Sequence, residues 1–321
     1  MNVKAYEHTP VLAAEVIRHL ACRPGGRYID GTVGGAGHAV AILEASRPDG
    51  RLLGIDRDPQ ALRAAAERLA PYAERVTLVR GNFAQMEDLA MAAGWYEANG
   101  ILLDLGVSSP QLDTPGRGFS YQHEAPLDMR MDPSIKQTAA DLVNQASEAE
   151  LTRILREYGE ERWASRISRF IVAARRREPI VTTMQLVEII KAAIPAGGRR
   201  EGGHPARRTF QALRIAVNDE LRSLERGLAA ACRLLAPGGR LVVISFHSLE
   251  DRLVKRFFQE RSRGCVCPPG LPVCACGRQA ELRVLTRRAV VPAGPEVEAN
   301  PRARSARLRA AVKVMVSEEA E

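Results

Sequence analysis

The organisation of this chain follows from one glycine-rich stretch, residues 30–38, which reads DGTVGGAGH. It comes at the end of Arg27–Thr32, a segment that we predict to be a strand. Glycines let the backbone approach a ligand closely and adopt positive φ. In an open α/β sheet, ligands bind outside the carboxyl ends of the strands. The stretch therefore predicts a ligand-binding loop, with a plain glycine-rich turn as the alternative.

Strand and helix signals alternate after this stretch. Further strands are predicted over Arg51–Asp56, Arg75–Val79 and Ile101–Leu105, and helices over Ala39–Ala45 and Pro59–Leu69. Asp58 is placed to cap the second of these helices, and Pro59 takes its first position, where a missing N–H costs nothing. Such alternation indicates βαβ units and predicts an α/β fold with a doubly wound, mostly parallel sheet.

The alternation stops after residue 110. The stretch 113–133 is rich in Gly, Pro, Asp and Arg and is interpreted as a loop. Helical signals without strands follow it, including two capping pairs, Ser147 with Glu150 and Thr182 with Gln185. We therefore predict an inserted all-helical domain over residues 111–205, which we interpret as the substrate-recognition domain.

The alternating pattern returns after the insertion. One long amphipathic helix is predicted from Leu213 to Leu235, ended by the Pro-Gly-Gly of residues 237–239. The last strand signals cover Arg240–Phe246, Leu282–Val290 and Ala306–Val316. The expected arrangement is a ligand-binding domain of residues 1–110 and 206–321, interrupted by the helical insertion.

The acidic residues around the glycine loop bear on the kind of ligand. Asp56 ends the second strand, about 20–25 residues beyond the glycines, where a carboxylate can accept both ribose hydroxyls of a nucleoside. The dinucleotide fingerprint fails, because Val40 stands where its third glycine would follow Gly35 and Gly37. Asp30 would repel a pyrophosphate but suits a cationic sulfonium and amino group. These residues favour S-adenosylmethionine over NAD.

A third acidic residue follows the fourth strand, in the stretch LLDLGVSSPQ of residues 102–111. In amino-group methyltransferases this position faces the reacting nitrogen. An exocyclic amine of cytosine or adenine is a poor nucleophile, since its lone pair is delocalised into the ring, and a nearby acceptor would activate and orient it. Asp104 and Ser108 are therefore candidate catalytic residues. A structural cap of the turn is the alternative role for Asp104.

Longer motifs run through nearly the whole chain. They are HTPVL (8–12), the glycine loop, GIDRDP (54–59), residues 103–113, RGFS (117–120), LDMRMD (127–132), YGEE (158–161), His204-Pro205, FQALRI (210–215), FHSLEDR (246–252) and residues 300–309. By these motifs the chain resembles the bacterial 16S ribosomal RNA cytosine-N4 methyltransferases, the ribosomal small-subunit methyltransferase H family.

The resemblance implies a class I Rossmann-like methyltransferase domain with a helical insertion after the fourth strand. It implies methyl transfer to N4 of a cytidine in the decoding centre of the small ribosomal subunit. The implied cofactor positions are Ala36, Gly37, His38, Asp56, Phe83, Asp104 and Gln111. Ala36 departs from the glycine expected there, and its methyl group is tolerable unless φ is positive at that position.

The segment after the fifth strand offers further candidates. His247, Ser248 and Asp251 could hold a flipped base or its phosphates, because a stacked base must leave its stack to reach such a pocket. We count His247 among the candidate catalytic residues. Alternatively, Glu250 and Asp251 simply open the next helix at its N-terminus. In the separate stretch of residues 128–132, Arg130 is expected to pair with a nearby carboxylate, with an RNA contact as the alternative.

Four cysteines lie close together in the sequence, as Cys265-x-Cys267 and Cys274-x-Cys276. Four thiolates in a tight loop could bind zinc tetrahedrally. The C-x-C spacing is not the usual C-x₂-C knuckle, so free thiols in a loop are the alternative. Cys22 and Cys232 are interpreted as ordinary core residues.

Charge and composition bear on the partner and the compartment. The net charge is +8 and the pI about 9.5, which favours a polyanionic partner such as RNA. Candidate phosphate contacts are Arg175–Arg177, Arg199, Arg200, Arg207 and Arg208, with solvated surface runs as the alternative. No signal peptide or membrane span is evident, so we expect a soluble cytoplasmic protein, either monomeric or homodimeric. The resemblance implies that its partner is 16S rRNA, which we expect it to meet within the small subunit.

Two other functions compete with a methyltransferase. A Rossmann oxidoreductase is opposed by the missing third glycine. A non-catalytic RNA-binding or assembly factor is disfavoured, because Asp56, Asp104 and the glycine loop occur together in one chain.

Overall fold

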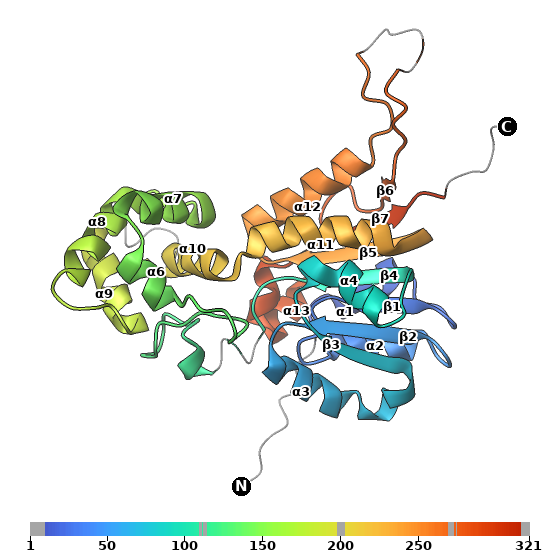
Figure 1. Ribbon diagram of the computed structural model, residues 1–321, viewed down its shortest axis with the longest axis horizontal. Helices are drawn as coiled ribbons and strands as arrows, with labels where there is room; N and C mark the ends of the chain where they lie inside the picture. The colour runs from blue at the N-terminus through green and yellow to red at the C-terminus, as the bar shows by residue number, and fades with distance from the viewer. Residues whose placement is uncertain are drawn as a thin grey trace. The chain divides into compact units, whose positions relative to one another are not determined.

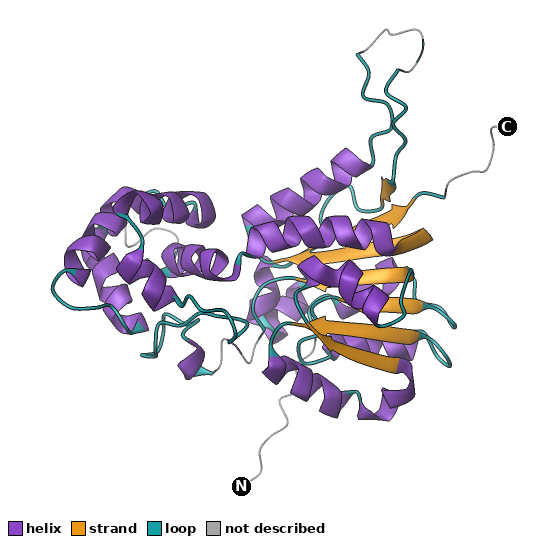
Figure 2. Cartoon of the chain, viewed as in Figure 1, coloured by secondary structure: helices purple, strands orange, loops and turns teal. Residues whose placement is uncertain are grey.

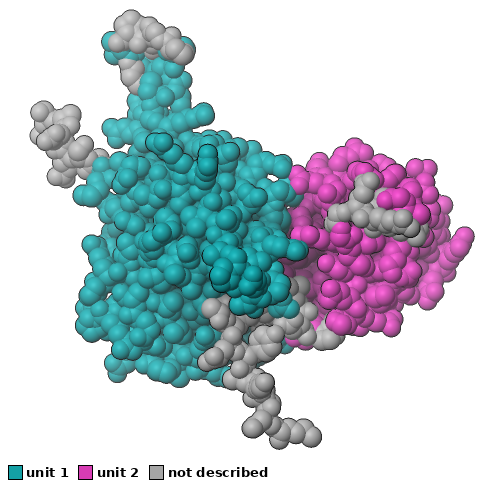
Figure 3. All heavy atoms as spheres, turned by 180° about the vertical axis from the view of Figure 1, so that it is seen from behind, with its two compact units in different colours: residues 1–106, 223–321 teal, residues 107–222 magenta. Residues whose placement is uncertain are grey.

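The computed structural model describes residues 10–108, 111, 114–197, 203–268, 273 and 275–315. It divides into two compact units (Figure 3). Unit 1 comprises Met1–Gly106 and Ser223–Glu321, and unit 2 comprises Val107–Arg222. In the part of the chain that is described, no helix is both long enough and apolar enough to cross a bilayer.

Unit 1 is built on one seven-stranded sheet (Figures 1 and 2). Its strands are β1 (Arg27–Asp30), β2 (Arg51–Asp56), β3 (Val76–Arg80), β4 (Ala98–Asp104), β5 (Leu235–Ser245), β6 (Leu282–Val284) and β7 (Arg307–Lys313). They lie in the order β3-β2-β1-β4-β5-β7-β6. The first five of these are parallel, and β7 is antiparallel to both of its neighbours. This is the doubly wound, mostly parallel, Rossmann-like sheet predicted from the sequence.

The two faces of the sheet carry separate apolar cores, because successive strand side chains point to opposite faces. In β4, Ile101 and Leu103 pack with helices of one face, whereas Leu102 packs with helices of the other. The first face holds α4 (Met86–Ala92), α11 (Glu220–Leu234) and α12 (Ser248–Arg261), and the second holds α1 (Ala13–Leu20), α2 (Gly37–Ala45) and α3 (Pro59–Arg68). A short helix, α13 (Gly294–Ala299), precedes β7.

Unit 2 is helical, as the sequence predicts. Its helices are α6 (Ala139–Gln145), α7 (Glu148–Gly159), α8 (Ala164–Arg175), α9 (Thr183–Ala193) and α10 (Arg207–Asn218). Both predicted caps are present: Ser147 accepts the Glu150 N–H, and Thr182 and Gln185 form a reciprocal capping box. The inward faces of these helices share one apolar core.

The predicted single helix from Leu213 to Leu235 is wrong. Asp219, with φ 49°, ends α10 in the left-handed region, and α11 starts at the next residue. The buried Asn218 explains the break, since its side chain accepts the Met131 N–H at 2.7 Å and donates to Met129 O at 2.8 Å. Helix periodicity alone does not reveal this long-range hydrogen bonding.

Other boundaries also differ from the expectation. The chain divides after Gly106 and after Arg222, not at 110/111 and 205/206. Helix α10 lies in unit 2, where Phe210 and Leu213 pack in the core. The predicted strand over Leu282–Val290 is ladder-paired only at Leu282–Val284, with an isolated bridge at Val290.

Candidate active site

Three aspartates lie along one edge of the unit 1 sheet. The parallel register pairs Asp30 at the end of β1 with Gly54 and with Leu102. Asp56 and Asp104 therefore each lie two residues further along their strands, at the same carboxyl edge. The strand order reverses direction between β1 and β4, and such a switch point is where open α/β sheets bind ligands.

The glycine loop crosses this edge before α2 begins. The Gly31 N–H donates to Leu102 O at 2.9 Å and the Val33 N–H donates to Ile55 O at 3.0 Å, so the loop is anchored on both neighbouring strands. A side chain at Gly35 would meet no heavy atom within 4 Å, whereas one at Gly31 would collide with Leu103. The loop thus needs small residues on its sheet side and leaves open space at Gly35.

Ala36 adopts the conformation that glycine favours. Its φ is 61°, and it forms the N-cap of α2 without any side-chain cap. Its methyl group is fully buried in the core on the second face of the sheet. Alanine would be tolerated here without cost only if φ were negative, and it is positive. A left-handed non-glycine residue costs roughly 1–2 kcal/mol.

Asp56 is tied to the glycine loop. Its carboxylate accepts the Gly34 N–H and the Asp58 N–H, both at 2.9 Å, and burial raises its pKa. An ionised carboxylate has about four acceptor positions, so two of them are left for a ligand. Asp58 has a separate role, since it caps α3 by accepting the Gln60 N–H at 2.9 Å, as predicted.

Asp30, His38 and Asp104 form the most unusual cluster of the site. His38 Nε2 lies 3.5 Å from Asp104 Oδ2, and the His38 side chain is only 6% exposed. Burial raises the pKa of Asp30 to about 7, although the nearby His38 opposes this shift. Within the described residues, no hydrogen-bond partner exists for either ring nitrogen of His38 or for Asp104 Oδ1. Because buried polar atoms are nearly always paired, these three atoms indicate a place for a ligand.

Two residues that position candidate site residues, Thr32 and Asn82, are not among the predicted ones. The Thr32 hydroxyl accepts the Asp104 N–H at 2.7 Å, and the Thr32 N–H donates to Asp30 Oδ1 at 3.1 Å. Thr32 thereby links two of the aspartates. Its spacing of two residues after Asp30 is typical of an Asx-turn and is the signal that could have revealed it. Asn82, the second, caps the turn that carries Phe83.

Phe83 is positioned by glycines on two elements. A side chain at Gly31 would come within 3.2 Å of Phe83 Cβ, and one at Gly227 in α11 would come within 2.4 Å of the ring. The ring is 8% exposed and belongs to the core on the first face of the sheet. The structure thus places Phe83 next to the glycine loop.

Two further candidates, Ser108 and Gln111, belong to unit 2. There the Ser108 N–H donates to Gln111 Oε1 at 3.1 Å, and Gln111 is buried. Their catalytic and cofactor roles stay predictions. Residues 8, 9, 109, 110, 112 and 113 of the predicted motifs lie outside the described residues.

His247 has a structural role at the start of α12. Its Nδ1 accepts the Glu250 N–H at 3.4 Å, and the Glu250 carboxylate accepts the Phe246 and His247 N–H groups at 2.9 and 3.3 Å. Asp251 forms two hydrogen bonds with the buried Arg309, at 2.6 and 3.1 Å. These contacts favour the helix-opening interpretation of this segment. His247 Nε2 is nevertheless buried without a hydrogen-bond partner among the described residues, and a catalytic role for His247 stays a prediction.

The arginine predictions have mixed outcomes. Arg130 is paired with Asp128 through two hydrogen bonds of 2.8 and 2.7 Å, as expected. Arg175 donates to Val143 O at 2.6 Å within unit 2. Arg176, Arg177, Arg207 and Arg208 are exposed, and Arg199 and Arg200 lie outside the described residues.

Three of the predicted zinc ligands gather in one loop. Cys265, Cys267 and Cys276 have sulfur atoms within 4.8 Å of one another. Cys274 lies outside the described residues. Cys232 is buried, as expected, and burial raises the pKa of the half-buried Cys22 to about 12.

Comparison with known proteins places the chain in a family. The family model described as "MraW methylase family" matches residues 5–314. "Ribosomal RNA small subunit methyltransferase H" of Symbiobacterium thermophilum is 63% identical over 98% of this chain and 99% of its own length, and the protein of that name from Geotalea daltonii is 60% identical over 96% and 99%. A solved rRNA methylase from Streptococcus thermophilus aligns over 95% of this chain and 93% of its own, with 10% identity and a TM-score of 0.40. On the strength of the matching family model and these sequence relatives, the chain belongs to the MraW methylase family.

Proposed function

We propose that this chain transfers a methyl group from S-adenosylmethionine to the N4 exocyclic amine of a cytidine in the decoding centre of 16S ribosomal RNA, in a bacterial cytoplasm. The observation that carries the proposal is the group of buried, unpaired polar atoms on His38 and Asp104 at the carboxyl edge of the sheet. The names of the sequence relatives support small-subunit rRNA as the substrate. The target nucleotide follows from the family resemblance.

The residues of the site fit S-adenosylmethionine. Asp56 has acceptor capacity left for the ribose hydroxyls, and the open space at Gly35 leaves room along the loop. Asp30 and Asp104 supply negative charge that attracts the cationic amino and sulfonium groups of S-adenosylmethionine. The same charge would repel an anionic pyrophosphate. Phe83 and the Ala36–His38 turn flank the same loop. When bound, the cofactor supplies an electrophilic methyl group on a sulfonium centre.

In this proposal, Asp104 and His38 orient the exocyclic amine and accept its proton. Asp104 Oδ1 accepts an N–H of the exocyclic amine, which orients the nitrogen and returns electron density to it. The amine loses one proton when its new N–C bond forms, and we assign that proton to the Asp104–His38 pair. His38 Nε2 lies 3.5 Å from Asp104 Oδ2, close enough for the Asp104 carboxylate to attract a protonated His38.

Unit 2 is the part of the chain that we assign to RNA recognition. Exposed arginines recur at helical spacing on α8 and the turns that flank it, at Arg162, Arg166, Arg169 and Arg176. Ile167 and Ile171 of the same helix face the core. The Arg166 guanidinium lies 5.4 Å from the Phe170 ring centre and the Arg162 guanidinium 5.0 Å from that of Trp163. An arginine face of this kind suits phosphate contacts.

The proposal is tested by labelled-methyl transfer to purified small ribosomal subunits that lack this modification. We expect incorporation of about one methyl group per subunit, and loss of incorporation with Asp104→Ala. Cofactor binding without any incorporation, on subunits and on naked 16S rRNA alike, would favour the non-catalytic assembly factor. A thermal shift with NAD and none with S-adenosylhomocysteine would favour the oxidoreductase.

A further inference from the structure

A loop of residues 262–281 joins α12 to β6, and its described residues form no helix or strand. It projects away from the sheet of unit 1 with its two arms side by side (Figure 1). Its valines contribute no core, since Val266 is 52% and Val273 77% exposed. Loops longer than about 12–15 residues without secondary structure are uncommon in compact domains and often have a function. Something other than apolar burial must hold the two arms together.

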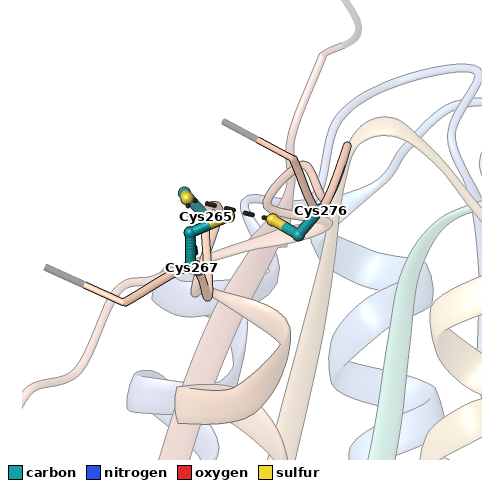
Figure 4. Close-up of side chains that lie close together, drawn as sticks. All are labelled: Cys265, Cys267 and Cys276. Atoms are coloured by element: carbon teal, nitrogen blue, oxygen red, sulfur yellow. Dashed lines mark hydrogen bonds between the residues drawn. The ribbon is translucent and has the colours of Figure 1, made fainter. Parts of the chain in front are cut away.

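Three thiols lie where the arms meet. Cys265 and Cys267 come from the first arm and Cys276 from the second (Figure 4). Cys265 Sγ and Cys276 Sγ are 3.8 Å apart. In a tetrahedral zinc site with Zn–S bonds of about 2.3 Å, the edge between two sulfur atoms is about 3.8 Å. We propose that Cys265, Cys267 and Cys276 bind one Zn²⁺ ion that clamps the arms of this loop.

The backbone around the sulfur atoms suits thiolates. The Val266 N–H donates to Cys276 Sγ and the Cys267 N–H donates to Cys265 Sγ, each at 3.4 Å. Such N–H groups stabilise the negative charge of a metal-bound sulfur and orient it. The exposed Arg263 and the Arg278 side chain, which donates to Glu260 O at 2.6 Å, add positive charge to the same part of the loop.

The base of the loop is already fixed by the fold. The Glu281 N–H donates to Arg261 O at 2.9 Å, and the side chains of these two residues form an ion pair. A zinc ion would therefore close a second, outer contact between arms whose ends are held, and it would order the loop without changing the sheet.

The clamp lies far from the methyl-transfer site. Helix α12 starts just beyond the carboxyl end of β5 and has 14 residues, so its far end is about 21 Å away. The strand pairing leads to the same conclusion. The loop ends at Leu282, which pairs with Lys313, and the neighbouring Val312 pairs with Arg240 near the amino end of the parallel run of β5. The proposed zinc is thus structural, and its loss should leave cofactor binding intact.

The experiment uses the full chain, purified under reducing conditions, stripped with a chelator and then titrated with Zn²⁺ or Co²⁺. We expect about one Zn²⁺ per chain by mass spectrometry of the metal, and with Co²⁺ the charge-transfer and d–d bands of a tetrahedral thiolate site. Cys265→Ser and Cys276→Ser should each weaken metal binding at least 100-fold. Cys22→Ser is the control, since Cys22 is half-buried and is not one of the clustered thiols, and it should bind zinc like the parent chain.

Each variant is also checked for binding of S-adenosylhomocysteine, which reports that unit 1 is folded. The proposal is overturned if the reduced parent chain binds no zinc, or if the Cys265→Ser/Cys276→Ser double variant still binds one ion per chain. The proposal is also overturned if Cys265 and Cys276 form a disulfide in chain purified without oxidant, as mass spectrometry of the peptides would show.

Discussion

Two regions of unit 1 hold clustered groups that are suited to a ligand, and they are built in opposite ways. At the carboxyl edge, Asp30, Asp56 and Asp104 are fixed by parallel strand register, with Asp30 buried and the other two partly exposed. In the loop of residues 262–281, three thiols meet on a segment with no core of its own. The contrast teaches that the first site is held by the surrounding fold, whereas the second would depend on the proposed zinc ion to join the arms of its loop.

The largest effect is expected from changes to the site at the carboxyl edge. Replacing Asp104 by alanine removes the acceptor that orients the amine, and the rate of methyl transfer should fall about 10³-fold. Binding of S-adenosylhomocysteine, measured by calorimetry, should change much less than the rate. The matched control is Asp88→Ala, at an exposed acidic residue in the first turn of α4, which should leave the rate unchanged. Equal rates for the two variants would remove Asp104 from the chemistry.

A smaller loss is expected at Asp56, where the effect should lie on binding. Hydrogen bonds to a charged acceptor contribute about 1.5–3 kcal/mol each, so Asp56→Asn should weaken cofactor binding about 10²-fold. Asp58→Asn, two residues further on, retains an N-cap residue and should bind normally. Calorimetric titration with S-adenosylhomocysteine distinguishes the two variants, and identical affinities would contradict the ribose role.

The pKa of Asp30 makes the site at the carboxyl edge sensitive to pH. Its pKa is raised from 3.8 to about 7, so between these values the folded apo chain holds a proton that the unfolded chain releases. Asp30 therefore favours folding at low pH, and this contribution is lost as the pH rises through 7.

Cofactor binding should respond to pH in the opposite direction. A cationic ligand favours the ionised Asp30, so affinity for S-adenosylmethionine should rise with pH up to about 7, by at most about tenfold per pH unit. Asp30→Asn should flatten both the affinity profile and the urea-unfolding profile. A parent-like pH dependence in this variant would show that another group titrates.

Removal of zinc by a chelator should affect the loop of residues 262–281 and leave the site at the carboxyl edge unchanged. Removal of zinc is expected to speed proteolysis within residues 262–281 several-fold, because the arms lose their outer contact. Affinity for S-adenosylhomocysteine should not change. If chelation left the cleavage pattern unaltered, the loop would be ordered by something other than a metal.

The smallest effect concerns the strained turn at Ala36. Ala36→Gly relieves the left-handed conformation but loses a buried methyl group, so a gain in unfolding free energy of at most about 1 kcal/mol is expected. Urea unfolding with the cofactor absent provides the measurement. A loss of more than about 1 kcal/mol would mean that methyl packing outweighs backbone strain.

Sequence patterns predicted the features that depend on short-range signals, such as strand ends and helix caps. The strand ends that carry Asp30, Asp56 and Asp104, the cap at Asp58 and the box at Thr182 all follow from short-range signals, and the structure confirms these elements. The break after Asn218 was missed because its cause is a hydrogen bond to Met131, far away in the sequence.

The sequence predicted which residues belong to the candidate site better than it predicted their contacts. The glycine loop and the aspartates stand out in the sequence, but the pairing of His38 with Asp104 depends on how α2 packs against the sheet. The role of Thr32 is likewise tertiary, since its hydroxyl reaches the backbone of a different strand. For His247, sequence alone left both roles open, and the observed contacts with Glu250 are those of a helix cap.

The most direct measurement is nucleoside mass spectrometry of 16S rRNA from small subunits incubated with the enzyme and methyl-labelled cofactor. The assignment of His38 and Asp104 to an amine predicts label on the N4 nitrogen of one decoding-centre cytidine, and none with Asp104→Ala. Label on a ring carbon or a ribose oxygen, or undiminished label with the Asp104 variant, would contradict it.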